Sequence, residues 1–327
     1  MARFGAYSEF GKLREVVVGS AQDLHLPPFG KDLSHYNDDL RKALVDNGNK
    51  PLDVSAAFPD LHKRTVEQIE NVAATYKDAG IKVHRPRAFT HEERIHLGVL
   101  QEGWSQLYPA DPVFVIGKHY MEISIRRAYR RKEAFPLREV VLPIVNADAE
   151  AHYVAMPQSA PWTPSGEGPG PFLEGGDLLI NGQDVFVGQG ELCSDQAGLD
   201  WLKRYLERWD YKVHPVPING PILHALGIMC LLREGLLMAH MPALVEGLPE
   251  PLKNWDVIEI TEDEMKGHAT VGVSLDQQRY MIDPRFGRIM DLLHKHGIEP
   301  VPTQCDAIGY WGGAIRCITL PLARDPA

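Results

Sequence analysis

The feature of this sequence that most restricts its fold is a repeated unit of two hairpin strands, a helix and a further strand. The three clearest copies begin near positions 177, 227 and 269, so they are spaced by roughly 45 residues. A period of this length is typical of repeat proteins, in which each unit buries its apolar face against its neighbours. Weaker copies near 13–86 and 112–146 bring the number of units to about five.

Five such units favour an α/β fold in which the units surround an axis as the blades of a propeller. The alternative is an ordinary α/β sandwich with accidental regularity, which the third clear copy disfavours. The Pro-, Gly- and Ser-rich segment 156–171 is interpreted as an active-site loop and not as a linker, because the same pattern continues after it. We therefore predict a single domain over residues 1–327. Helices are expected at 64–79, 198–208, 242–252 and 285–296.

Composition and charge exclude several classes of protein. Hydrophobic residues make up 44% of the chain and charged residues 24%, which is usual for globular proteins. The net charge of -10 would repel a phosphate backbone, so we expect no nucleic-acid partner. No apolar run reaches the roughly 18 residues of a membrane helix, so we expect no membrane partner. The N-terminus lacks the apolar core of a signal peptide, which predicts a cytoplasmic protein.

The cysteines point to free thiols and not to metal ligands. The chain has four of them, at Cys193, Cys230, Cys305 and Cys317. None lies in a CxxC pair, and no His/Cys spacing is typical of a zinc site, so no metal is predicted. Each could be a small buried hydrophobe, which is the commonest environment of a free cysteine.

Residues with chemical potential fall at matching boundaries of the repeat. Asp111 and the segment Glu174–Asp177 each precede a hairpin, His224 precedes the next one, and Cys317 follows a Gly-Gly pair. Taken singly, each has a purely structural alternative. In the same order, these are a turn or helix cap, a polar turn, a hydrogen-bonded core histidine and a small side chain that fills the core. Equivalent strand boundaries converge near the axis of a radial repeat, so we predict one pocket that holds carboxylates, an imidazole and a thiol.

The chemistry that suits such a pocket is narrow. A thiolate is a strong nucleophile, and a nearby imidazole can give and take protons. The pair would attack a planar carbon, as in amides, esters, nitriles and guanidiniums. Carboxylates favour a cation held through paired N–H···O bonds, and a guanidinium presents a planar fork of such donors. The residues therefore favour attack on a guanidinium carbon over acyl transfer.

The motifs resemble those of the guanidino-group modifying enzymes, which include arginine deiminases, dimethylarginine hydrolases, agmatine deiminases and amidinotransferases. The resemblance rests on Pro-x-Asp at 109–111, Glu-Gly-Gly-Asp at 174–177, His224 and Gly-Gly-x-x-x-Cys at 312–317, and it runs from segment 7–19 to the last residues. It implies a five-bladed α/β propeller, known as the pentein fold. It also implies that neither a metal nor an organic cofactor takes part.

The resemblance assigns a role to each motif residue. Cys317 would be the nucleophile that forms a covalent amidino intermediate, and His224 would be its acid and base. Asp111 and Glu174 would hold the guanidinium, while Asp177 would bind it or support the loop. Further substrate-binding candidates are Arg126, Arg127 and Arg316. For Arg126, Arg127 and Arg130, which follow the Asp111 hairpin, the alternative is a solvated surface position.

The similarities within the superfamily divide between branches. Segments 111–131, 198–206 and 211–214 are similar to amidinotransferases, whereas the tail 316–325 is similar to arginine deiminases. We favour an amidinotransferase that takes a small cationic guanidino donor and an amine acceptor. A hydrolase of arginine or of a substituted guanidine is the alternative. A third is a non-catalytic binding module, because a ribosome anti-association factor shares the fold. A homodimer is left open.

One position departs from the pattern of the family. Deiminases and amidinotransferases usually carry Asp two residues after the catalytic His, and Leu226 stands there in this chain. A missing carboxylate removes a charge-assisted hydrogen bond of roughly 1.5–3 kcal/mol. Either another acid replaces it, or the substrate is a guanidine that is N-substituted or less polar at that edge, or activity has been lost.

Overall fold

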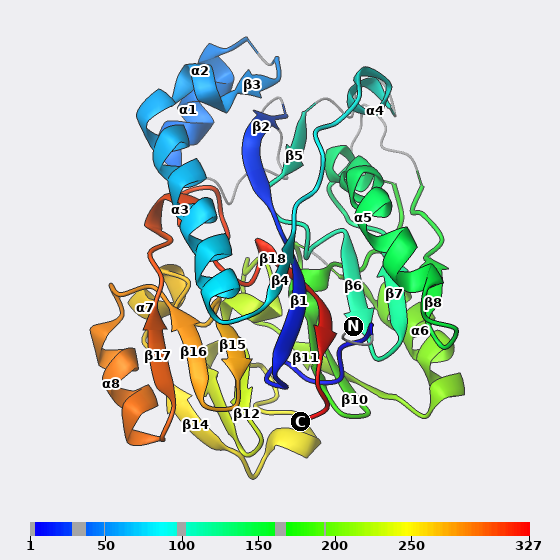
Figure 1. The fold of residues 1–327 in the computed structure, drawn as a ribbon, viewed down its shortest axis with the longest axis vertical. Helices are drawn as coiled ribbons and strands as arrows, with labels where there is room; N and C mark the ends of the chain where they lie inside the picture. The colour runs from blue at the N-terminus through cyan, green and yellow to red at the C-terminus, as the bar shows by residue number, and fades with distance from the viewer. Residues whose placement is uncertain (1–3, 28–36, 49, 97–102, 161–167, 193) are drawn as a thin grey trace.

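This computed structural model describes residues 4–27, 37–48, 50–96, 103–160, 168–192 and 194–327. The described part of the protein contains six three-stranded sheets. Five of the sheets share one design, an antiparallel pair with a third strand parallel to the central one. Figure 1 shows them arranged around β1 and β18. The repeated unit predicted from the sequence is therefore confirmed as the building block of the fold.

Four blades follow one another along the chain, each from its own segment. Their strands are β6 (Val113–Ile116), β7 (His119–Glu122) and β8 (His152–Ala155); β9 (Leu178–Asn181), β10 (Asp184–Gln189) and β11 (Lys212–Pro217); β12 (Met229–Arg233), β13 (Leu236–Ala239) and β14 (Asp256–Glu259); β15 (Val273–Asp276), β16 (Arg279–Ile282) and β17 (Glu299–Pro302). The first two strands of each blade are almost continuously buried, as expected where both faces of a sheet are covered.

The first blade joins the two ends of the chain. Its central strand β1 (Leu13–Val18) is parallel to β4 (Lys82–His84) and antiparallel to β18 (Thr319–Arg324). The sequence indicated a weak copy near 13–86; β1 and β4 come from that segment, but the antiparallel partner of β1 comes from the C-terminus. The pairing of β1 with β18 joins the two ends of the chain and so closes the ring of blades. It also covers the edge of β1, which would otherwise be unpaired.

A sixth sheet lies outside the repeat, at the top of Figure 1. It contains β3 (Leu52–Asp53), β2 (Ser20–Leu26) and β5 (Trp104–Gln106) in that order, with both outer strands antiparallel to β2. Helices α1 (Asp38–Asp46), α2 (Val54–Ala57), α3 (Pro59–Asp78) and α4 (His91–Ile95) belong to the same part of the chain. Leu24 and Leu26 of β2 and Ser105 of β5 line a cavity that Cys317 and His224 also line.

Three of the four helices predicted from the sequence are present, and the fourth is not. Helix α3 covers the predicted 64–79, α6 (Gln196–Leu206) covers most of 198–208, and α8 (Gly287–Lys295) lies within 285–296. The other helices of the described chain are α5 (Ala134–Asn146), α7 (Glu262–Lys266) and α9 (Asp306–Gly309). The helix predicted at 242–252 was wrong, since two short 3₁₀ turns stand there, Met241–Ala243 and Glu250–Leu252. The segment carries three prolines, which remove backbone donors and stop an α-helix.

Two remaining observations concern the whole chain. Of the segment 156–171, interpreted from sequence as an active-site loop, residues 161–167 lie outside the described residues. Among the helices that are described, none has both the length and the apolar character needed to cross a membrane.

Closure of the ring through β18 leads to a test of stability. Leu322 on β18 is fully buried, so Leu322→Ala should lower the free energy of unfolding by about 2–5 kcal/mol. Val45→Ala, at a side chain that is 55% exposed, serves as the control and should change little. Denaturant unfolding measures both, and equal midpoints for the two variants would contradict the closing role of β18.

Candidate active site

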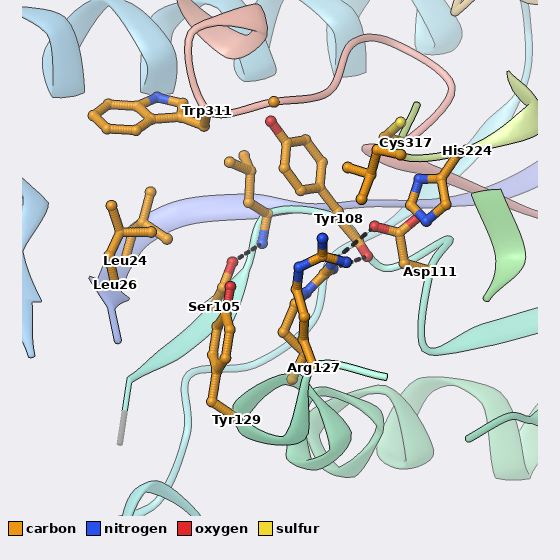
Figure 2. Close-up of a pocket in the computed structure, with 14 residues that line it drawn as sticks. Leu24, Leu26, Ser105, Tyr108, Asp111, Arg127, Tyr129, His224, Trp311 and Cys317 are labelled. Carbon is orange, nitrogen blue, oxygen red and sulfur yellow. Dashed lines mark hydrogen bonds and ion pairs between the residues drawn. The ribbon is translucent and has the colours of Figure 1, made fainter. Parts of the chain in front are cut away.

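A narrow cavity lies where the sixth sheet meets the ends of the blades (Figure 2). Cys317, His224 and Asp111 are on one side of this view, while Leu24 and Leu26 of β2 are on the other. The remaining lining residues are Ser105, Leu107, Tyr108, Arg127, Tyr129, Arg130, Leu223, Trp311 and Gly312. The structure thus brings the thiol, the imidazole and one carboxylate of the sequence-predicted set into a single cavity.

Cys317 is held on a tight loop just before β18. Its backbone N–H donates to the carbonyl of Ala314 at 3.1 Å, and its own carbonyl accepts from Ala110 at 3.4 Å. The glycine pair of the motif permits this path. A Cβ on Gly313 would lie 2.8 Å from the ring of Tyr108, so a larger residue would push the loop away from the cavity.

His224 is oriented by the Glu-Gly-Gly-Asp segment. Its Nε2 lies 2.8 Å from Oε2 of Glu174, which is fully buried. Its ring packs against Gly176, where a Cβ would come within 2.4 Å of Nδ1. Glycine at this position therefore lets the motif approach the imidazole closely.

Asp177 supports the backbone beside His224 and does not line the cavity. Its Oδ1 accepts from the N–H of Ala225 at 3.0 Å, and its Oδ2 accepts from the N–H and Oγ of Ser194 at 3.1 and 2.6 Å. Glu174 is likewise outside the lining, and its Oε1 accepts from the backbone N–H of Arg126 at 3.0 Å. Both carboxylates of the motif thus lie behind the imidazole.

Asp111 faces the cavity with one of its two oxygens engaged. Arg130 donates to Oδ2 from Nη1 at 2.8 Å, and it also donates to Glu133 and to the carbonyl of Tyr108. Oδ1 of Asp111 is buried and has no hydrogen-bond partner among the described residues. Asp111 therefore has a fixed orientation and one acceptor position left for a ligand.

The arginine candidates separate into two groups. Arg127 and Arg130 are 3% and 6% exposed and line the cavity, so a solvated surface position is wrong for both. Arg126 is half-buried, and its guanidinium stacks over the ring of Phe172 outside the lining. Arg316 does not line the cavity, and its Nε donates to Oε2 of Glu9 at 3.2 Å.

Leu226, at the position where the family usually has Asp, packs in the apolar core near β12 and does not line the cavity. The structure therefore places no carboxylate at this position of the site.

Sequence reasoning missed part of the lining. Arg130 was considered with Arg126 and Arg127, but its contact with Asp111 was not predicted, although Glu133 follows it by three residues, a spacing that brings both side chains to one face of a helical turn. Leu24 and Leu26 alternate along β2, the usual period for one face of a strand, but the role of that strand was not evident. Ser105, Tyr129, Leu223 and Trp311 gave no signal that separated them from structural residues.

Burial controls the ionisation of the site. It raises the pKa of the Cys317 thiol to about 11, with Asp111 adding to the rise and His224 opposing it. Burial also raises the pKa of Glu133 to about 7 and that of Asp177 to about 6. For Glu174 burial is outweighed by the hydrogen bond to His224 and the charge of Arg127, which together lower its pKa to about 2.

These values describe a substrate-free site that holds a neutral thiol. We expect the pKa of Cys317 to fall when His224 is protonated or a cation is bound. Without such a cation, desolvation is the dominant effect.

The other thiols are structural in their surroundings. Cys230 is buried, its sulfur lies 3.4 Å from the hydroxyl of Tyr280, and its pKa is raised to about 12. Cys305 is also a buried free thiol, and Cys193 lies outside the described residues. Within the described ranges no cluster of three or more His, Cys, Asp or Glu side chains could hold a metal ion.

The raised pKa of Cys317 predicts a slow reaction with alkylating agents. In the substrate-free protein, modification of Cys317 by iodoacetamide should rise with pH up to about 11, because burial disfavours the thiolate. Peptide mass spectrometry after short exposures measures the rate at this residue, with Cys230 as an internal comparison. A half-maximal rate at or below about pH 8.5, the value of a free thiol, would contradict the expectation.

The low pKa of Glu174 predicts a pH-dependent contribution to stability. The pKa is lowered from 4.5 to about 2, so the ionised group stabilises the fold above its unfolded pKa, and this is lost as the pH falls through about 2. Glu174→Gln should therefore destabilise the protein most near neutral pH, and the difference from wild type should shrink toward about pH 2.

Denaturant titrations at several pH values measure this difference, with Glu207→Gln at an exposed position as the control. A difference that stays constant across the acid range would show that the loss is one of packing and not of charge.

Comparison with known proteins places this geometry in context. No protein-family model matches the chain. A putative inosamine-phosphate amidinotransferase 2 of Streptomyces griseus is 25% identical, covering 100% of this chain and 98% of that protein. The solved inosamine-phosphate amidinotransferase of the same organism has a TM-score of 0.82 at 20% identity and covers 100% of this chain and 98% of its own.

A dimethylarginine dimethylaminohydrolase structure has a TM-score of 0.63 at 14% identity, covering 94% of this chain and 99% of its own. The TM-score is therefore higher for the amidinotransferase than for this hydrolase. The five-bladed α/β propeller and the full-length similarity confirm the resemblance of this chain to the guanidino-group modifying enzymes, and among them to the amidinotransferases.

Proposed function

We propose that this protein is an amidinotransferase that moves an amidino group from a guanidino donor to an amine acceptor through Cys317. The observation that carries the proposal is the meeting of Cys317, His224 and Asp111 in one cavity of a fold similar over its full length to amidinotransferases. A thiol, an imidazole and a carboxylate acceptor supply the nucleophile, the proton carrier and the anchor for a cation.

The first half-reaction begins when the guanidinium donates an N–H to Oδ1 of Asp111. Its positive charge beside Cys317 favours the thiolate and offsets the effect of burial on the thiol pKa, and His224 takes the thiol proton. The sulfur attacks the guanidinium carbon and a C–S bond forms. His224 gives a proton to the departing nitrogen, the C–N bond breaks, and the amidino group remains on the sulfur.

The second half-reaction returns the enzyme to its starting state. His224 takes a proton from the acceptor amine, whose nitrogen then attacks the amidino carbon. The C–S bond breaks, the electron pair returns to sulfur as thiolate, and the new guanidine leaves. His224 then returns its proton to the sulfur, which restores the neutral thiol. No atom changes its oxidation state in this sequence, so the steps require neither a metal nor an organic cofactor.

The contacts suggest a division of labour among the acids. Asp111 is the carboxylate that would touch the substrate, while Glu174 acts as a positioning residue that fixes the ring of His224. Asp177 anchors the backbone at Ala225 and so positions His224 from the other side. Arg130 would orient Asp111, and Arg127 would balance the charge of Glu174, from whose Oε2 its Nη1 lies 3.7 Å.

Water in place of an amine would make the same site a hydrolase, and a retained fold without turnover would make it a binding module. The lower structural similarity to the dimethylarginine hydrolase supports the transferase over the hydrolase. A single domain over 1–327, a homodimer, a cytoplasmic location and the absence of nucleic-acid and membrane partners stay predictions.

Replacing the nucleophile tests the proposal directly. Cys317→Ser should lower amidino transfer by at least about 1,000-fold, because oxygen is a far weaker nucleophile here and no covalent amidino adduct forms. The assay supplies arginine, agmatine or alkylguanidines with and without hydroxylamine as a small acceptor, and it follows release of the donor's amine. Mass spectrometry follows the adduct on Cys317.

Cys230→Ala is the matched control, since that thiol is buried outside the cavity and should leave turnover in place. Product formation at the same rate without an acceptor would assign the chain to the hydrolases instead. Full turnover in Cys317→Ser would remove the proposed nucleophile.

A further inference from the structure

The carboxylate oxygens near the reacting centre are nearly all engaged. Both oxygens of Glu174 accept hydrogen bonds, one from the backbone of Arg126 and one from His224. Both oxygens of Asp177 accept from Ser194 or Ala225. Neither carboxylate lines the cavity, so neither is placed to grip a guanidinium there.

Asp111 supplies the one carboxylate oxygen in the described lining that is still open. Arg130 holds Oδ2, and Oδ1 is buried with no partner among the described residues. A substituted guanidinium carries up to five N–H donors, and a buried donor left unpaired is costly. Recognition of the guanidinium head through Asp111 alone is therefore weak, and the rest of the substrate must supply much of the selectivity.

The far end of the cavity is apolar. Leu24 and Leu26 lie across the view from Cys317 in Figure 2, and they come from β2 of the sheet that stands outside the repeat. Leu107, Leu223 and Trp311 also line the cavity, and Ser105 and Tyr129 add hydroxyl groups, of which that of Ser105 already accepts from the N–H of Leu107 at 3.0 Å. Leu226 offers no carboxylate, since it packs in the core. A chain that extends from the reacting carbon toward β2 thus meets leucine side chains.

Charge in the cavity also disfavours a second cationic group on the substrate. The two charged side chains that line the cavity besides Asp111 are Arg127 and Arg130, both cations. Each already faces a carboxylate, Glu174 at 3.7 Å for Arg127 and Asp111 at 2.8 Å for Arg130. An ammonium placed among them would meet like charges without an open carboxylate of its own in the described lining.

We infer that the amidino donor is a guanidine with an apolar alkyl or aryl substituent, whose body packs against Leu24 and Leu26. This inference rests on the proposed function. The guanidinium donates a hydrogen bond to Oδ1 of Asp111, and the substituent displaces water from the side chains of Leu24 and Leu26, called here the leucine wall. A donor whose body ends in a charged amine or an amino-acid group fits this wall less well.

A pair of donors of equal length tests the inference on the wild-type protein. Pentylguanidine and agmatine differ in one terminal group, a methyl in the former and an ammonium in the latter. With hydroxylamine as acceptor, kcat/KM for pentylguanidine should exceed that for agmatine and for arginine by at least about tenfold. Equal or better turnover of agmatine or arginine would overturn the inference and leave the proposed function standing.

Absence of turnover and of any Cys317 adduct with all three donors would overturn the proposed function, and this inference with it.

A matched pair of variants tests whether the leucine wall causes the preference for pentylguanidine over agmatine. Leu26 and Leu52 face each other across the β2–β3 ladder and are both buried, but Leu26 lines the cavity and Leu52 does not. Leu26→Asn should lower the ratio of kcat/KM for pentylguanidine over agmatine by about tenfold, while Leu52→Asn should leave the ratio unchanged.

Thermal unfolding checks that both variants are folded, and Leu24→Asn provides a second change on the same face. A ratio that moves equally in the cavity and control variants, or in neither, would contradict the placement of the substrate body.

Discussion

The pairing of β1 with β18 is the constraint on which the rest of the structure depends. It joins strands that lie about three hundred residues apart and completes the first blade, so no blade of the ring is left without its antiparallel pair. Cys317 lies two residues before β18, and the carbonyl of its neighbour Ile318 accepts from Gly19 at 2.8 Å, directly after β1. The same closure that completes the ring therefore fixes the nucleophile at the cavity.

Closure also explains why Arg316, adjacent to Cys317 in sequence, does not reach the cavity. Arg316 extends to Glu9, while Cys317 lines the cavity together with His224. Arg324 is also buried and donates to the carbonyls of Gly11 and Ser274. Buried charges of this kind contribute little net stability, since the cost of desolvating them offsets much of their attraction.

The sequence anticipated those features that depend on local pattern. Repeat boundaries predicted that Cys317, His224 and Asp111 converge, and they do. Features that depend on distant partners were not predictable in the same way. The burial of Arg130 depends on Asp111 and Glu133 folding around it, and an arginine in a polar stretch looks identical when solvated.

The first blade shows the same limit, since nothing local in β1 indicates that its partner is the last strand of the chain. The sixth sheet was missed because it interrupts the repeat. Its strands β3 and β5 span two and three residues, which is too short to produce a period in the sequence.

The electrostatics of the site imply that the substrate controls its own nucleophile. In the substrate-free protein, burial raises the pKa of the Cys317 thiol and keeps it protonated, and the negative charge of Asp111 raises this pKa further. A guanidinium bound at Oδ1 of Asp111 would cancel that carboxylate's effect and add a positive charge beside the sulfur. Thiolate then forms when a cation is in place, so the proposed enzyme would present little reactive sulfur to other electrophiles or oxidants between turnovers. Glu174, ionised throughout the neutral range, keeps His224 ready for both proton transfers without itself exchanging a proton.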